Sequence, residues 1–200
     1  MPIIDKDGNV GYFAWESREE FTWFGINRSQ YKMTNLIELA KQIRFDNASK
    51  GFDPTEGGIE RYLLLTVSEI CEAQNELRDG HGPTEIYYSD SDLSLKPKPE
   101  GFPVEIADAI IRILDIQAKL ELDIEMMDTD YNWDLGQTEE ELLKVVHLVS
   151  RNDMSMRFKL NLALTRLFHI SHDLGIDVMK VINEKLEYNR TRPAKHGRKF

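Results

Sequence analysis

Two pairs of acidic residues have the types and the spacing that a divalent-cation site requires. Glu69 and Glu72 lie three positions apart in the run LLLTVSEICEAQNELR, and Glu105 and Asp108 have the same spacing in the run VEIADAIIRILDIQAKL. Residues at positions i and i+3 of a helix project from the same face. If both runs are helical, four carboxylates can converge. Such all-oxygen ligand sets favour Mg²⁺, Mn²⁺ or Ca²⁺ over zinc, and Mg²⁺ commonly shares its coordination with substrate phosphates.

Charge repulsion limits how such a group of carboxylates can exist. Two carboxylates about 6 Å apart repel each other by about 3 kcal/mol at an effective dielectric constant of about 20. Four converging carboxylates would therefore cost an amount comparable with the whole stability of a domain, about 5–15 kcal/mol. Such a cluster is expected to persist only with cations bound or with some groups protonated. The alternative is that both pairs lie on solvated helix faces, where Glu-x-x-Glu is common.

The run that carries the second acidic pair is apolar around most of the circumference of the predicted helix. Its apolar positions are Ile106, Ala107, Ile110, Ile111, Ile113, Leu114 and Ala118. A helix of this composition is largely buried. Its polar stripe comprises Glu105, Asp108, Arg112, Asp115 and Lys119. This narrow stripe is expected to face a cleft or a partner helix rather than open water.

Helix-start residues, glycine stops and closing prolines divide the chain into six segments with helical patterns. The segments are 35–48, 59–78, 103–126, 138–150, 155–173 and 177–189. Signals for strands are scarce. The sequence therefore predicts an all-α fold, a helical bundle of about five to six helices.

One helical domain, residues 33–200, accounts for most of the predicted organisation. It is preceded by an irregular arm rich in aromatic side chains, residues 1–32, and it ends in a basic tail, residues 190–200. A long loop, residues 79–102, joins the two acidic helices and is rich in Gly, Pro, Ser and Asp. Loops longer than about 12–15 residues in compact domains tend to be functional or disordered. The loop is interpreted either as a lid near the acidic site or as a tolerated insertion.

The charge balance argues against a general nucleic-acid-binding protein. The chain carries a net charge of −10, and the eleven residues of the basic tail hold five positive charges, so the preceding 189 residues carry −15. A nucleic-acid-binding domain is expected to show a basic footprint instead. No stretch approaches about 18 uncharged apolar residues, so no membrane span is expected.

The cysteine content and the N-terminus favour a cytoplasmic location. Cys71 is the single cysteine, which excludes an intramolecular disulfide and fits a reducing compartment. Its place between two glutamates disfavours a thiolate, so it is expected to be a small core residue. The beginning MPIIDKDGNV has no basic region followed by an apolar run, and no secretory signal is expected.

The two acidic pairs resemble the metal-binding motifs of the MazG-like all-α nucleoside triphosphate pyrophosphohydrolase superfamily. The hallmark of that superfamily is E-x-x-E on one helix and E-x-x-D on the next, matched by Glu69 with Glu72 and by Glu105 with Asp108. The ending KLEYNRTRPAKHGRKF is similar to the Lys-x-x-x-Asn and basic ending of many members. The resemblance covers residues 33–200.

This resemblance implies a Mg²⁺-dependent enzyme, with Mn²⁺ as an alternative cation. Its substrate would be a nucleotide of the NTP or dNTP class, cleaved between the α and β phosphates to a nucleoside monophosphate and pyrophosphate. All four carboxylates would be metal ligands and catalytic residues. Lys185 and Asn189 share one helix face and would bind phosphate together, assisted by Arg192 as a planar bidentate donor. The resemblance also implies a homodimer or a homotetramer.

The chain departs from the pattern of that superfamily in several places. Ser68 stands where many members have an additional Glu that could activate water. The general base is therefore left open between a metal-ligating carboxylate and a metal-bound hydroxide. The 79–102 loop is longer than usual, and the resemblance explains neither the extra segment 128–157 nor the arm 1–32.

Two other functions fit parts of the sequence. A non-catalytic helical interaction module could use its acidic faces to bind a basic partner. Another kind of metal-dependent phosphohydrolase could use His172 and Asp173 as a metal-binding doublet, with His147 upstream. That pattern needs a later, well-separated Asp, and Asp177 is too close. Histidines near a helix end are also favoured by the helix dipole alone.

Overall fold

The computed structural model divides the chain into two compact units, Met1–Lys32 and Met33–Phe200. Its described residues are 3–4, 10–11, 22–23, 26–27, 33–90, 96–127 and 138–197, and side chains are described from residue 36 to residue 195 within these ranges. The described part of the first unit consists of four two-residue strands, paired antiparallel as β1 (Ile3–Ile4) with β2 (Val10–Gly11) and β3 (Thr22–Trp23) with β4 (Ile26–Asn27). The aromatic side chains of the predicted arm lie outside the described residues.

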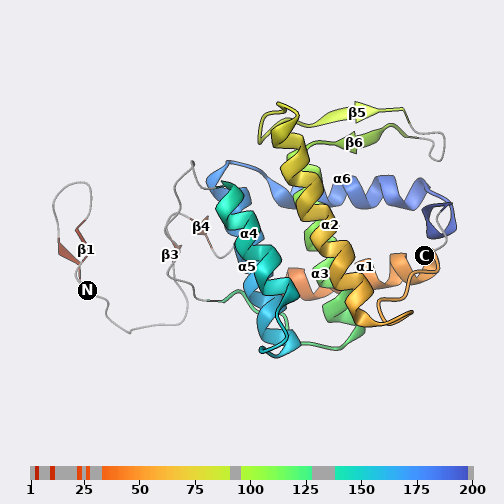
Figure 1. Ribbon diagram of the computed structural model, residues 1–200, viewed down its shortest axis with the longest axis horizontal. Helices are drawn as coiled ribbons and strands as arrows, with labels where there is room; N and C mark the ends of the chain where they lie inside the picture. Colours follow the sequence, from red (N-terminus) through yellow and green to blue (C-terminus); the bar gives the residue numbers. More distant parts are fainter. Residues whose placement is uncertain are drawn as a thin grey trace. The chain divides into compact units, whose positions relative to one another are not determined.

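The second unit is a helical bundle, which confirms the predicted all-α fold (Figure 1). Its described part has six α-helices: α1 (Met33–Ser49), α2 (Ile59–Arg78), α3 (Phe102–Lys119), α4 (Thr138–Ser150), α5 (Met156–Asp173) and α6 (Val178–Thr191). A short 3₁₀ turn, Ala194–Gly197, follows α6. Among the described helices, none combines the length and the apolar character needed to cross a membrane.

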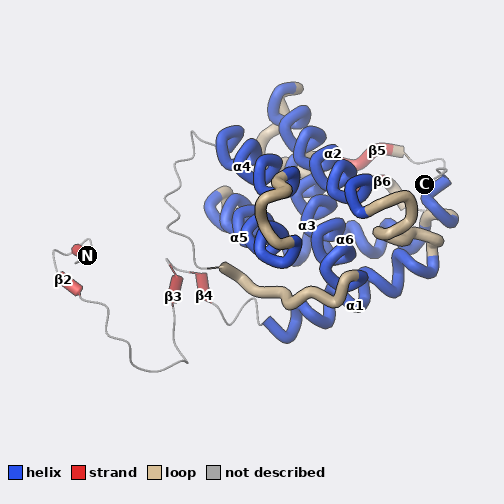
Figure 2. Tube along the Cα trace, turned by 60° about the horizontal axis from the view of Figure 1, so that its bottom comes forward, coloured by secondary structure: helices blue, strands red, loops and turns tan. Residues whose placement is uncertain are grey.

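Helix α3 is the centre of this bundle. It packs against α1, α2, α5 and α6, and both views place it in the middle of the helices (Figure 1 and Figure 2). Fourteen of its 18 residues are buried, as its apolar circumference predicts. Burial of one large aliphatic side chain contributes about 1.5–3 kcal/mol. The hydrophobic surface of α3 therefore supplies much of the energy that fixes its three acidic residues in place.

The C-terminal end of α3 lies seven residues earlier than the sequence predicts, at Lys119 rather than at Met126. The backbone N–H of Leu122 donates to the carbonyl of Gln117 at 2.9 Å, and Glu121 has a φ of 52°. This is a left-handed helix end of the kind that glycine usually provides. The prediction was wrong because a glutamate occupies the left-handed position, so the usual sequence signal is missing.

The predicted 79–102 loop contains an antiparallel hairpin. Strand β5 (Tyr87–Ser89) pairs with β6 (Lys98–Glu100), with Tyr87 opposite Glu100, while residues 91–95 lie outside the described residues. The Tyr87 hydroxyl donates to the carboxylate of Glu76 on α2 at 3.1 Å, and the Tyr88 hydroxyl donates to Glu184 on α6 at 2.6 Å. The hairpin therefore links α2 to α6 beside the acidic helices.

The described part of the basic tail folds back onto the segment that follows α1. The backbone N–H of Lys195 donates to the carbonyl of Lys50 at 2.7 Å, and its ammonium pairs with Glu56 at 3.2 Å. The Lys50 ammonium donates to the carbonyls of Arg190 and Arg192, at 2.9 and 2.5 Å. These bonds satisfy carbonyls at the end of α6 and hold the tail against residues 50–56.

The start of α3 requires a glycine. Gly101 has a φ of 113° and a ψ of 163°, and an added Cβ would lie 2.3 Å from the carbonyl oxygen of Glu85. Both the backbone region and the contact exclude a side chain. The Gly101 carbonyl accepts the N–H groups of Val104 and Glu105, at 2.8 and 3.2 Å. This turn therefore sets where α3, the helix that carries Glu105, begins.

We expect Gly101→Ala to lower the free energy of unfolding by about 2–4 kcal/mol, because it adds a steric clash to a strained backbone. Gly80→Ala is a matched control, since Gly80 has a φ of 94° but no atom within 4 Å of an added Cβ. The control should cost only the strain, about 1–2 kcal/mol. Urea unfolding of both variants measures the difference, and equal losses would contradict the role of the Glu85 contact.

Candidate metal centre

Three of the four predicted carboxylates converge where α2 packs against α3. Glu69 on α2 and Glu105 and Asp108 on α3 each offer an oxygen, and these oxygens all lie within 4.8 Å of one another. Glu69 and Glu105 are only 5% and 4% exposed. Within the described residues, this is the one group of three or more His, Cys, Asp or Glu side chains that converges in this way.

The spacing and chemistry of these three oxygens fit a hard divalent cation. Opposite ligands of Mg²⁺ are separated by about 4.2 Å, twice the metal–oxygen distance, and those of Ca²⁺ by about 4.6–5.2 Å. A spread of up to 4.8 Å therefore needs at most a small inward movement to hold Mg²⁺. The residues that would hold the cation are Glu69, Glu105 and Asp108. Waters and substrate oxygens commonly complete such a shell.

Glu72 lies outside this group of three. It is exposed, and its carboxylate accepts a hydrogen bond from the Ser68 hydroxyl at 3.2 Å. Its negative charge nevertheless acts on Glu69 and Glu105. Cys71 is exposed on the same helix, so its predicted place in the core is wrong. Residues 71 and 72 lie on the side of α2 that faces away from the core, whereas Glu69 faces α3.

Two cationic side chains, buried Lys185 and half-buried Arg112, pair with the cluster. The Arg112 guanidinium donates from Nε to Glu69 Oε1 at 2.5 Å, and the Lys185 ammonium lies 2.8 Å from Asp108 Oδ2. Lys185 is 3% exposed and reaches the cluster from α6. Sequence reasoning selected Lys185 but gave Arg112 no role beyond its place in the polar stripe. The signal was available, because Arg112 lies at i+4 from Asp108 and therefore shares its face of α3.

Burial shifts the proton equilibrium of the cluster. Desolvation, followed by the charge of Asp108, raises the pKa of Glu105 to about 8, against the opposing effect of Lys185. Desolvation also raises the pKa of Glu69, although Arg112 acts in the opposite direction. At neutral pH without a cation, Glu105 is therefore mainly protonated. The cluster then holds two carboxylates, two cationic side chains and one neutral acid, so its charges balance.

A pocket lies directly beside the cluster and collects the predicted substrate-binding residues. Lys185, Asn189 and Arg192 line it together with Asp108 and Arg112. Its other lining residues are Asn47, Phe52, Tyr62, Ile111 and Asp115. The side-chain oxygen of Asn189 is buried and has no hydrogen-bond partner among the described residues. The pocket therefore combines positive side chains with polar groups that a ligand can satisfy.

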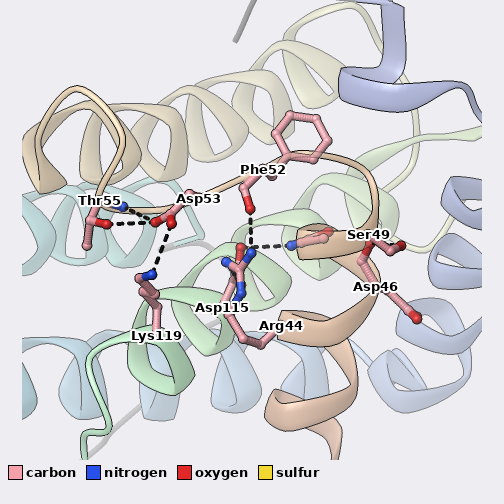
Figure 3. Close-up of polar contacts among 9 residues, drawn as sticks. Arg44, Asp46, Ser49, Phe52, Asp53, Thr55, Asp115 and Lys119 are labelled. Carbon is pink, nitrogen blue, oxygen red and sulfur yellow. Dashed lines mark hydrogen bonds and ion pairs between the residues drawn. The ribbon is translucent and has the colours of Figure 1, made fainter.

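Another buried carboxylate, that of Asp115, holds the wall of this pocket. Asp115 accepts from Arg44 at 2.6 Å and from Asn47 at 2.8 Å, and Arg44 also donates to the carbonyl of Phe52 (Figure 3). Burial raises the pKa of Asp115 to about 6, with Arg44 acting in the opposite direction. These bonds fix α1 and the following segment against α3. Asn47 and Phe52 thereby keep their positions at the pocket.

The His172–Asp173 doublet of the alternative phosphohydrolase lies at the end of α5 and not in the metal cluster. His172 Nδ1 lies 3.0 Å from Asp173 Oδ1 at the end of α5. Neither residue, nor His147, belongs to a converging group of three potential ligands within the described part of the chain. The doublet forms a local contact at a helix end.

Neither the family models, nor the curated proteins, nor the solved structures with which the chain was compared show a match. The resemblance to MazG-like enzymes therefore rests on the residues themselves, and the geometry of the site carries the functional argument.

The raised pKa of Glu105 predicts a pH-dependent stability of the metal-free protein. The ordinary value is 4.5 and the folded value is about 8, so the folded state retains a proton that the unfolded state loses within this window. The stability that Glu105 contributes is complete below pH 4.5 and is lost as the pH rises through 8. Glu105→Gln removes this loss and should stabilise the protein at pH 8.5 by about 1–3 kcal/mol.

Chemical denaturation in EDTA at pH 5.5 and pH 8.5 measures this effect. Glu140→Gln serves as the control, because Glu140 is exposed on α4. Parallel pH profiles for the wild type and Glu105→Gln would contradict the assignment.

Proposed function

We propose that this protein is a Mg²⁺-dependent nucleoside triphosphate pyrophosphohydrolase of MazG-like type, with Mn²⁺ as an alternative cation. It would act in the cytoplasm as a homodimer or homotetramer. The observation that carries the proposal is the convergence of Glu69, Glu105 and Asp108 beside a pocket lined by Lys185 and Asn189. A hard-cation site next to basic side chains suits a substrate rich in phosphate oxygens.

The charge of the loaded site supports an anionic substrate. When a divalent cation replaces the proton of Glu105, three carboxylates face two positive charges of the cation and two of the side chains Arg112 and Lys185. The cation-loaded cluster then has a net charge of +1. A second cation would raise this value further. Low-dielectric surroundings strengthen the resulting attraction for a triphosphate.

The chain's own residues would bind and orient the triphosphate. Lys185 lies between the cluster and the pocket and supplies a compact positive charge. Arg192 offers a planar fork that suits two phosphate oxygens, and the Asn189 side chain offers a further polar contact. The cation, when bound, supplies charge neutralisation at the phosphates and polarises the bond to be broken.

Glu72 is the one carboxylate of the two acidic pairs that is not a converging ligand, and it would accept a proton from water. It lies next to the cluster in sequence and acts on it electrostatically, but it is exposed and outside the group of three oxygens. In the proposed step, water attacks the α-phosphorus and its proton passes to Glu72. The α–β phosphoanhydride bond breaks and pyrophosphate leaves. Ser68 stands at the position where many members of the superfamily carry an additional Glu, and Glu72 would take the role of that residue.

A panel of NTPs, dNTPs and modified nucleotides incubated with Mg²⁺ should yield monophosphate and pyrophosphate. Glu69→Gln and Asp108→Asn should each lower kcat/KM by about 100-fold or more, because each removes a ligand of the cation. Glu140→Gln, an exposed change on α4, is the control and should leave activity intact. Light scattering on the same sample distinguishes a homodimer from a homotetramer.

Release of orthophosphate alone, or full activity in both ligand variants, would show that the proposed mechanism is wrong. Calorimetric titration with Mg²⁺ or Mn²⁺ separates the remaining alternative. If the protein binds neither cation and gains no thermal stability from them, a helical interaction module becomes the better explanation.

The role of Glu72 gives a separate expectation. Glu72→Gln should lower kcat by about 10²–10⁴-fold, the usual contribution of a general base. Its Mg²⁺ affinity should fall less than that of Glu69→Gln, since Glu72 is not one of the converging ligands. Calorimetry and single-turnover kinetics give the two quantities. Equal losses of Mg²⁺ affinity in both variants would instead make Glu72 a cation ligand.

A further inference from the structure

A guanidinium is bonded to a carboxylate that the proposed cation site needs. Arg112 Nε donates to Glu69 Oε1 at 2.5 Å, while the two terminal nitrogens of Arg112 make no hydrogen bond within the described residues. The Arg112 side chain is 27% exposed and lines the pocket that also contains Lys185 and Arg192. The guanidinium therefore contacts the metal cluster on one side and borders the pocket on the other.

A divalent cation at Glu69 would place two positive charges beside this guanidinium. At such distances the Coulomb repulsion exceeds what one hydrogen bond contributes. The guanidinium retains negative neighbours if it turns away, because Asp115 lies at i+3 on α3 and lines the same pocket. Electrostatic interaction between Arg112 and Asp115 already exists in this structure. A second position for the guanidinium is thus available within the pocket.

We propose that Arg112 is the counter-ion of the metal-free cluster, and that a divalent cation displaces its guanidinium from Glu69 into the pocket, where it binds the phosphate chain of the substrate. The phosphate contact rests on the proposed function, whereas the exchange at Glu69 depends on cation binding alone. Arg112 would join Lys185 and Arg192 as a third cationic phosphate ligand. Because only the loaded protein releases Arg112, the cation binds before the nucleotide.

Arg112→Gln tests the exchange, with Mn²⁺ alone as the probe. The variant removes a charge that competes with the cation, so the Kd for Mn²⁺ should fall by about fivefold or more while the Tm of the metal-free protein decreases. Arg166→Gln is a matched control. Arg166 pairs with buried Glu141 at 2.6 Å and is 24% exposed, close to the values for Arg112 and Glu69, but belongs to a different helix pair. It should lower Tm similarly without changing the Kd for Mn²⁺.

A measurement on the wild-type protein keeps the test independent of how well Arg112→Gln folds. The Arg112 Nε–H resonance, assigned by its loss in Arg112→Lys, should be shifted and protected from exchange in EDTA because Glu69 accepts its hydrogen bond. Addition of Mg²⁺ should abolish both the shift of this resonance and its protection from exchange. An unchanged resonance, or Mn²⁺ affinity that is unchanged or weaker in Arg112→Gln, overturns the proposal.

Inorganic tripolyphosphate tests the second position of Arg112. With Mg²⁺ present, Arg112→Gln should bind it about tenfold more weakly than the wild type, and without Mg²⁺ the two proteins should not differ. Equal binding with Mg²⁺ overturns the phosphate contact. If the wild type exchanges Arg112 for Mg²⁺ but hydrolyses no nucleotide, the proposed function alone fails. If the wild type releases pyrophosphate but the Arg112 Nε–H resonance does not change when Mg²⁺ is added, the proposed role of Arg112 alone is wrong.

Discussion

Helix α3 is charged as well as buried, and its charged side chains govern how the neighbouring helices pack. A helix that is buried around most of its circumference carries acidic residues that need opposite charges, because an unpaired buried carboxylate is costly. Three charged residues of the central stripe each pair with a different neighbouring helix. Asp108 pairs with Lys185 of α6, Arg112 pairs with Glu69 of α2, and Asp115 pairs with Arg44 of α1. The helices that supply these partners, α1, α2 and α6, are three of the four helices that pack against α3.

This arrangement makes one set of contacts serve stability and site geometry together. Apolar side chains of α3 supply the burial energy, while three ion pairs fix its rotation and height relative to α1, α2 and α6. Ion pairs of this kind contribute little net stability, because the cost of desolvating the charges offsets their attraction. At one end of the stripe, Glu105 is left with a proton rather than a cationic partner of its own. A cation in place of this proton would meet three carboxylates whose oxygens lie within 4.8 Å of one another.

Much of the fold was predictable because its signals are local. Helix periodicity, starting residues and glycine stops gave α2 and α4 with their observed bounds and the other helices to within a few residues, apart from the end of α3. That end was missed since Glu121 adopts a backbone conformation that glycine usually marks. The hairpin β5–β6 was missed because each strand has only three residues, and its side-chain partners lie on α2 and α6. Cys71 was misplaced because helix rotation, not residue type, decides its exposure.

The candidate site likewise has features that local sequence signals predict and features that depend on helix packing. The sequence predicted that Glu105 and Asp108 share a face of α3, because residues at i and i+3 of an α-helix project from the same side, and both join the cluster. It also determined that the helix bearing Glu105 is buried. The three-dimensional packing adds that Glu69 turns inward while Glu72 faces solvent, and that Arg112 and Lys185 complete the charge balance. Those outcomes depend on how α2 and α6 are rotated against α3, and that rotation arises from packing among segments distant in the chain.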